Sequence, residues 1–251
     1  MVDAIFDNPR LAQVYDPLDP DRRDLDVYSA LVDQLGARSV LDIGCGTGSF
    51  ACELAGRGID VIAVDPAAAM LEVARSKPGA DAVEWVHGDA TTLPVHLVDA
   101  AFMTGNVAQV FLTDHEWATV LRAARRTLRP GGWLVFETRV PARRAWEQWT
   151  PELTHTAVDV PGIGIVESWE DLIEVTADLV TFRSMTAFSR DGVVIESVST
   201  LRFRDRSEVE ATLVDNGFEI AEVRDAPDRP GREYVFLARR RSSLAARAAR
   251  L

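Results

Sequence analysis

The stretch Val40-Leu41-Asp42-Ile43-Gly44-Cys45-Gly46-Thr47-Gly48-Ser49-Phe50 decides the fold of this chain. An apolar run ends in an acid and continues into three alternating glycines, which predicts a strand, a tight loop and a helix over about residues 49–57. Glycine adopts backbone angles that other residues avoid, and it lets a ligand approach the main chain because it carries no Cβ. The first N–H groups of the helix are free to face that ligand. We therefore expect this loop to lie beneath a cofactor.

Two features of the loop indicate the charge of the cofactor. The dinucleotide pattern G-x-G-x-x-G would require a glycine five residues after Gly44, where this chain has Ser49. Asp42, just before the loop, would repel a pyrophosphate and attract an ammonium or sulfonium group. A cationic ligand is therefore favoured. The alternative, an NAD(P)-dependent oxidoreductase, is disfavoured by both features.

With these residues, the stretch resembles motif I of the class I S-adenosylmethionine-dependent methyltransferases, whose usual form is close to V-L-D-x-G-C-G-T-G. The resemblance implies an α/β fold with a doubly wound, seven-stranded, mostly parallel sheet in the order 3-2-1-4-5-7-6. It also implies that S-adenosylmethionine is the cofactor, and that a methyl group passes by in-line displacement to oxygen, nitrogen or carbon of a small molecule. In this interpretation Asp42, Gly44, Cys45, Gly46 and Gly48 contact the cofactor.

A second predicted strand, residues 60–65, ends in Asp65. An acid at this place in doubly wound folds accepts hydrogen bonds from ribose hydroxyls. We assign that role to Asp65, since a carboxylate that ends an apolar strand has little structural purpose. Pro66 begins the next helix, and the resemblance places Pro66 and Met70 near the adenosine, although a methionine in a helix is usually a core residue.

Two later turns extend the resemblance. The turn Gly88-Asp89-Ala90 implies that Asp89 accepts a hydrogen bond from the adenine amine; the alternative is a helix-capping aspartate. The predicted strand over residues 98–103 is followed by Gly105 and Asn106. At the carboxyl end of a parallel strand, these two residues are predicted to line the methyl-transfer site.

Few side chains need to be catalytic, because a sulfonium leaving group is already activated. A base helps a hydroxyl or ammonium acceptor, and His115 in the first turn of a predicted helix is our candidate; the alternative is a solvated or packing histidine.

Tyr15 resembles a tyrosine that covers the methionine end of the cofactor in related enzymes. The alternative is that Tyr15 is a core or lid residue without cofactor contact. We expect no metal site.

Composition bounds the remaining possibilities. The chain has 251 residues, 47% of them hydrophobic, and a net charge of −12, which argues against nucleic acid or an anionic membrane as partner. It has no long apolar run and no signal-peptide pattern, so we expect a cytoplasmic protein. Its two cysteines suggest no disulfide framework, and its single lysine, Lys77, hints at a GC-rich bacterial genome.

We predict four parts of the chain. Residues 1–36 form a helical cap, residues 37–140 and 205–240 the cofactor-binding core, and residues 241–251 a basic tail. Residues 141–204 form an inserted antiparallel sheet, with strands at about 163–175, 179–189 and 193–203. The insertion is a substrate lid or a dimer interface, so the protein is a monomer or homodimer. A non-catalytic subunit that kept the fold is a further alternative.

Overall fold

The computed structural model describes residues 2–89, 92 and 96–242. Ala90 and residues 243–251 of the predicted basic tail lie outside the described residues.

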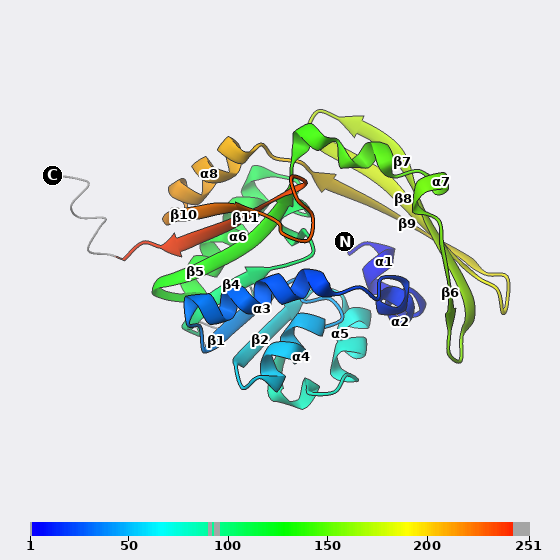
Figure 1. Ribbon diagram of the computed structural model, residues 1–251, viewed down its shortest axis with the longest axis horizontal. Helices are drawn as coiled ribbons and strands as arrows, with labels where there is room; N and C mark the ends of the chain where they lie inside the picture. Colours follow the sequence, from blue (N-terminus) through cyan, green and yellow to red (C-terminus); the bar gives the residue numbers. More distant parts are fainter. Residues whose placement is uncertain (1, 90–91, 93–95, 243–251) are drawn as a thin grey trace.

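The core is one seven-stranded sheet with the order β10-β11-β5-β4-β1-β2-β3 (Figure 1). Strands β5, β4, β1, β2 and β3 are parallel, and the terminal hairpin of β10 and β11 pairs antiparallel with β5. The predicted fold and strand order are confirmed. The bounds are β1 Ser39–Ile43, β2 Asp60–Asp65, β3 Val83–His87, β4 Val98–Met103, β5 Leu128–Arg139, β10 Phe218–Asp225 and β11 Glu233–Arg240.

The inner strands β1, β2 and β4 are largely apolar and buried because helices cover both faces of the sheet. On β1, Leu41 and Ile43 pack in one core cluster with side chains of α6 (Asp114–Thr127) and α8 (Arg206–Asp215). Val40 packs in another cluster with side chains of α3 (Arg23–Leu35) and α4 (Ser49–Gly56). The predicted capping box at the start of α6 is confirmed: Thr113 Oγ1 accepts from Glu116 N at 3.1 Å, and Glu116 Oε2 accepts from Thr113 N at 2.9 Å. The sheet order reverses between β1 and β4, so their carboxyl ends open a crevice there.

The helices have the following bounds. The α-helices are α1 Ala4–Asp7, α2 Pro9–Leu18, α3 Arg23–Leu35, α4 Ser49–Gly56, α5 Ala68–Arg75, α6 Asp114–Thr127, α7 Pro151–Thr154 and α8 Arg206–Asp215. The 3-10 helices are η1 Ala80–Ala82, η2 Val107–Gln109, η3 Pro141–Arg143 and η4 Ala145–Gln148. Among the described residues, none of these helices has the length and apolar character needed to cross a bilayer.

The insertion between β5 and α8 is an antiparallel sheet of four strands, not the three that we predicted. The three predicted strands are present as β7 Gly164–Thr176, β8 Leu179–Phe188 and β9 Val194–Arg202. The missed strand is β6 Thr156–Val160, which pairs only with β7. It is short and lies at the sheet edge, so its pairing with β7, and not its own pattern, defines it.

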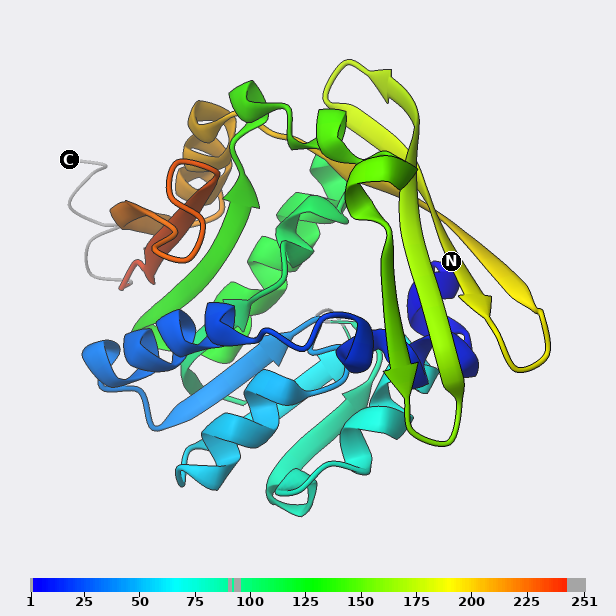
Figure 2. The same ribbon diagram turned by 45° about the vertical axis from the view of Figure 1, so that its right-hand side comes forward.

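The N-terminal helices join the core to the inserted sheet (Figures 1 and 2). Leu11 and Val14 of α2 pack against Val166 and Phe188 of the inserted sheet. Ile5 N donates to Ser197 Oγ of β9 at 2.8 Å. On the other side, α2 contacts α5 of the core. The inserted sheet is thus held beside the crevice through these helices.

Candidate functional site

The glycine loop joins β1 to α4, as predicted, and its three glycines have positive φ angles of 73°, 53° and 74°. They differ in what a Cβ atom would meet. A Cβ on Gly44 would lie 2.6 Å from Val107, and one on Gly48 would lie 2.4 Å from the Trp85 ring, whereas Gly46 has nothing within 4 Å. Gly44 and Gly48 are therefore required by packing within the protein. Gly46 is the position with open space above it, where a ligand can reach the backbone.

Asp65, at the end of β2, holds this loop in place. Its Oδ2 accepts from Gly46 N and its Oδ1 from Ala67 N, each at 2.8 Å. The expectation that such a carboxylate has little structural purpose is wrong, because Asp65 ties the glycine loop to the turn after β2. Burial raises the pKa of Asp65, against these two hydrogen bonds. A carboxylate oxygen can accept more than one hydrogen bond, so both oxygens can still take a ligand hydroxyl.

Asp42 is a buried acid without a partner. It is 1% exposed, and neither carboxylate oxygen accepts a hydrogen bond from any residue that the structure describes. Burial, and to a smaller extent the Asp65 charge, raises the pKa of Asp42 to about 7, although Arg22 acts in the opposite sense. An unpaired buried carboxyl costs free energy unless it is protonated or meets a cation. Asp42 is thus suited to a positively charged ligand beside the loop.

The exit of β4 is tied to the neighbouring strands by Asn106, which is 3% exposed and has a positive φ of 62°. Asn106 N donates to Glu137 Oε1 at 2.5 Å, and its Nδ2 donates to Glu233 Oε1 at 3.1 Å. Arg229 Nη1 also donates to Glu233 Oε1, at 3.0 Å. Burial raises the pKa of Glu137 to about 7. Asn106 therefore holds the loop that we predicted to line the site, while Gly105 beside it is exposed with open space above it.

We did not predict Glu137 as a residue of this site. It ends the apolar run of β5 just as Asp65 ends that of β2. The same signal, applied to both strands, would have found it.

The remaining predicted cofactor residues are spread over the carboxyl edge of the sheet. Cys45 is partly buried, and burial raises the pKa of its thiol, so it is no ready nucleophile. Pro66 and Asp89 are exposed, and Gly88 N donates to Asp65 O at 3.0 Å. Met70 is 1% exposed and packs in a small cluster with alanines, as a core methionine does.

His115 is exposed in the first turn of α6. Another histidine, His155 in the insertion, differs from His115 because its ring pairs with Glu167 at 2.9 Å and stacks on Trp169.

Charged and polar side chains from distant parts of the chain lie near enough to act on one another's charge beside these residues, and we call the space among them the acceptor-side recess. Tyr15 is 36% exposed, yet burial raises the pKa of its hydroxyl, so protein surrounds a side chain that solvent still reaches. The charges of Arg22 and Arg139 lower that pKa in turn. Arg22 also acts on Asp42, and Arg139 acts on Glu170 of β7. We define this recess by Tyr15, Arg22, Arg139 and Glu170; the carboxylate oxygens of Asp42 are fully enclosed and do not line it.

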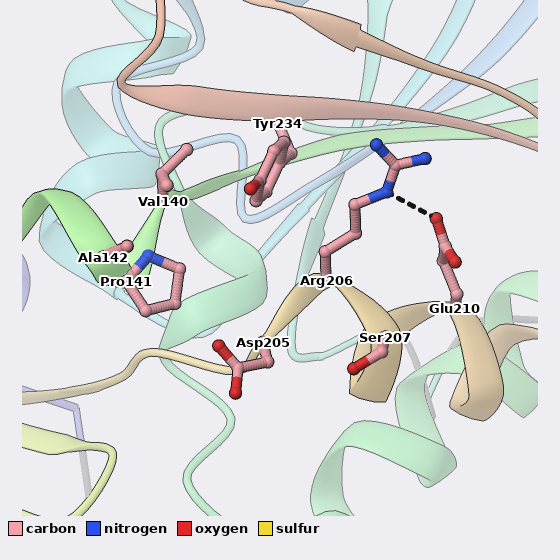
Figure 3. Close-up of a pocket in the computed structure, with 8 residues that line it drawn as sticks. All are labelled: Val140, Pro141, Ala142, Asp205, Arg206, Ser207, Glu210 and Tyr234. Atoms are coloured by element: carbon pink, nitrogen blue, oxygen red, sulfur yellow. Dashed lines mark hydrogen bonds and ion pairs between the residues drawn. The ribbon is translucent and has the colours of Figure 1, made fainter.

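A separate pocket of about 350 Å³ lies beside α8 (Figure 3). Arg206 Nε donates to Glu210 Oε1 there at 2.6 Å, and the Arg206 guanidinium lies 5.9 Å from the centre of the Tyr234 ring. The pocket contains none of the predicted site residues. We place the candidate site at the glycine loop because the unpaired Asp42, the open Gly46 and the recess meet there. The lining residues of the pocket are Val140, Pro141, Ala142, Asp205, Arg206, Ser207, Glu210 and Tyr234.

Comparison with known proteins identifies a family for part of the chain. Residues 40–132 match the family model described as a methyltransferase domain. This segment is a class I S-adenosylmethionine-dependent methyltransferase domain. It includes the glycine loop, Asp65 and the exit of β4. The findings give no support to the alternative of an oxidoreductase.

The relatives of the methyltransferase domain are similar over part of their length. The biotin biosynthesis bifunctional protein BioHC of Cellvibrio japonicus (strain Ueda107) is 36% identical over 124 residues, which are 46% of this chain and 23% of that protein. A demethylmenaquinone methyltransferase of Clavibacter sepedonicus is 38% identical over 98 residues, 39% of each chain. The chain therefore spans well under half the length of these relatives.

Among solved structures, the likeness of fold covers nearly the whole chain. The CcbJ methyltransferase from Streptomyces caelestis has a TM-score of 0.74 at 22% identity and covers 92% of this chain and 96% of its own. The sugar N-methyltransferase KedS8 from Streptoalloteichus sp ATCC 53650 has a TM-score of 0.73 at 23% identity, with coverage of 91% and 93%. Because these alignments cover more than nine-tenths of the chain, the likeness includes most of the inserted sheet.

The different surroundings of the loop glycines give a prediction for the methyltransferase domain. Gly48→Ala combines a strained positive φ with the Trp85 contact and should lower the free energy of unfolding by about 2–4 kcal/mol. Gly46→Ala carries only the strain, about 1 kcal/mol, and should weaken cofactor binding more than it destabilises the protein. Urea unfolding and calorimetry measure the two effects. Equal losses of stability in the two variants would contradict the distinction.

Proposed function

We propose that the protein transfers a methyl group from S-adenosylmethionine to oxygen, nitrogen or carbon of a small-molecule acceptor. The single observation that carries the proposal is the buried, unpaired Asp42 next to the open backbone of Gly46, within a domain of this family. A cofactor bearing a pyrophosphate would meet the carboxyls of Asp42 and Asp65 at this place. A sulfonium or ammonium group would instead be stabilised by them.

The residues present fit S-adenosylmethionine. Asp65 would accept the ribose hydroxyls, Gly46 would give the ligand access to the backbone, and Asp42 would face its positive charge. The contacts of Gly44, Cys45, Gly48, Pro66, Gly88, Asp89, Ala90 and, less directly, Met70 with the cofactor remain predictions. When bound, the cofactor supplies an electrophilic methyl group on a sulfonium leaving group.

The chain's own part in the reaction is to orient the acceptor and to exclude water. The acceptor-side recess supports this role, since Tyr15, Arg139 and Glu170 bring polar groups to it from three different parts of the chain. The match to a methyltransferase domain and to methyltransferase relatives favours an enzyme over a subunit without catalytic function. For an acceptor that must lose a proton, His115 remains our candidate base; its side chain is exposed in the first turn of α6.

We propose the source, location and acceptor class of the protein from its composition and its relatives. The reported relatives are bacterial proteins, and with the single lysine they support a bacterial source. The charge of −12 supports a small-molecule acceptor over nucleic acid or an anionic membrane surface. A cytoplasmic location, a monomeric or homodimeric state, the four-part division of the chain and the role of the insertion as lid or dimer interface remain proposals on the same footing.

Calorimetry with S-adenosylmethionine is the first test of the function. We expect binding in the micromolar to low millimolar range, and no detectable binding at millimolar cofactor would overturn the proposal. Incubation of the protein with methyl-labelled cofactor and fractionated small-molecule pools then separates an enzyme from a binding subunit. Label transferred to a small molecule identifies the acceptor class, whereas binding without transfer to any pool favours the subunit.

Asp65→Ala should weaken binding of S-adenosylmethionine at least about tenfold, or about 1.4 kcal/mol. Because Asp65 also holds the loop, Asp99→Ala serves as a matched control: Asp99 Oδ2 accepts from Arg38 N and Ser39 N at the opposite edge of the sheet. Both variants should lose stability in urea unfolding. An equal loss of cofactor affinity in Asp99→Ala would mean that the effect of Asp65 is only structural.

Cofactor binding should depend on pH through Asp42. Its carboxyl has a pKa of about 7 in the free protein, and a cation beside it favours the charged form. Binding below pH 7 must therefore release a proton, about one per cofactor near pH 6 and few above pH 8. Affinity should rise with pH across this window.

Calorimetry in buffers with different heats of ionisation counts the protons. Asp42→Asn should abolish the release and weaken binding. Glu137→Gln controls for the other acid whose pKa burial raises to about 7 and should keep the release. If proton release persisted in Asp42→Asn and vanished in Glu137→Gln, the proton would come from Glu137 and the prediction for Asp42 would be wrong.

A further inference from the structure

Arg139 is a half-buried cation that forms no ion pair with the residues that the structure describes. It lies at the carboxyl end of β5, and among the described residues its guanidinium forms no ion pair within 4 Å. Its one side-chain hydrogen bond runs from Nη1 to the neutral Gln109 Oε1, at 3.0 Å. Burial lowers the pKa of Arg139, against the attraction of Glu233, Glu170 and Glu137. Those acids are near enough to act on its charge but do not hydrogen-bond to it.

The guanidinium is nevertheless held in a fixed place. Gln109 is 1% exposed, and its Nε2 donates to Arg202 O at 3.3 Å, which fixes the amide that receives Arg139. The Arg139 guanidinium also lies 5.6 Å from the centre of the Trp149 ring. Its Nε and Nη2 groups have no hydrogen-bond partner among the described residues and are not among the fully enclosed unpaired atoms, so they are free to donate to a ligand. A positioned cation with free donors is the usual arrangement for recognising an oxyanion.

Glu170 faces the same space from the inserted sheet. It lies on the face of β7 that includes Val166, whose side chain packs against α2, while Trp169 points to the opposite face and stacks on His155. The Glu170 carboxylate accepts no hydrogen bond from the described residues and is not among the fully enclosed unpaired atoms. Its oxygens are thus free to accept from a ligand in the recess.

From this arrangement we infer that Arg139 anchors the methyl acceptor by an oxyanion, a carboxylate or phosphate group, and that Glu170 accepts from a hydroxyl or ammonium group next to it. That the bound molecule is a methyl acceptor rests on the proposed function. That an oxyanion binds at Arg139 rests on its unpaired guanidinium. Arg139 and Glu170 then determine specificity, since an acceptor without the oxyanion would leave the cation unpaired.

The experiment measures binding of two simple probes to the full chain saturated with S-adenosylhomocysteine, at constant ionic strength. Inorganic phosphate is followed by phosphorus NMR line broadening and acetate by saturation transfer, so the two arms separate phosphate from carboxylate recognition. We expect at least one probe to bind, and Arg139→Gln to weaken it about tenfold or more. Arg139→Lys should keep part of the affinity because it keeps the charge.

Two further variants test the assignment. Glu170→Gln removes a carboxylate that repels a simple anion, so it should tighten probe binding about threefold. Arg206→Gln is the matched control, since Arg206 also lies over an aromatic ring but is ion-paired with Glu210 outside the recess; it should leave binding unchanged. Far-ultraviolet circular dichroism and binding of S-adenosylhomocysteine verify that each variant is folded.

Three results would overturn the inference: equal probe binding by the wild type and Arg139→Gln, an equal loss in Arg206→Gln, or no tightening in Glu170→Gln. Failure of the proposed function is seen separately, as absence of cofactor binding. In that case the same titrations on the cofactor-free protein still test the anion site.

Discussion

The site depends on one carboxylate that gathers two backbone turns. Asp65 accepts from Gly46 N of the glycine loop and from Ala67 N of the turn after β2. Val64 O, one residue earlier, accepts from Gly44 N at 2.8 Å and Cys45 N at 3.2 Å. The end of β2 thus shapes the loop after β1 through the protein's own hydrogen bonds. Because these hydrogen bonds order the loop, they lower the free energy that a bound cofactor has to supply for ordering it.

The charges that surround this frame are incompletely paired, and the reason is not stability. Asp42 has no hydrogen-bond partner and Arg139 no ion pair among the described residues. Leaving a buried charge unpaired costs several kcal/mol, on the order of 3–5, when a partner is removed. Asp42 escapes part of that cost by holding its proton up to about pH 7. Arg139 cannot lose its proton, so its cost is reduced by the nearby acids, by its hydrogen bond to Gln109 and by the Trp149 ring. Both are explained if a ligand of opposite charge completes each of them.

Much of the fold and of the cofactor half of the site could be predicted, because short segments carry their own signals. The loop glycines, Asp65 and the capping box at Thr113 are each visible within a few residues. Strand β6 was missed because an edge strand of five residues is defined by its partner. The structural role of Asp65 was missed because its donors, Gly46 N and Ala67 N, are backbone groups that no residue type announces. Arg139 and Glu170 were missed because their meeting depends on how the inserted sheet packs.

The difference between a site formed by one continuous segment and a site formed by distant segments also explains what the chain shares with other proteins. The family match ends at residue 132, before Arg139 and the inserted sheet, while the likeness of fold to CcbJ covers 92% of the chain. The cofactor side is built from one continuous segment that includes Asp42, Gly46 and Asp65. The acceptor side is assembled from α2, the end of β5 and the inserted sheet. Side chains at such scattered positions can change without disturbing the loop that Asp65 holds. One framework can therefore present different acceptor sites. In this chain, the unpaired guanidinium of Arg139 is the group on the proposed acceptor side that a ligand of opposite charge would stabilise most.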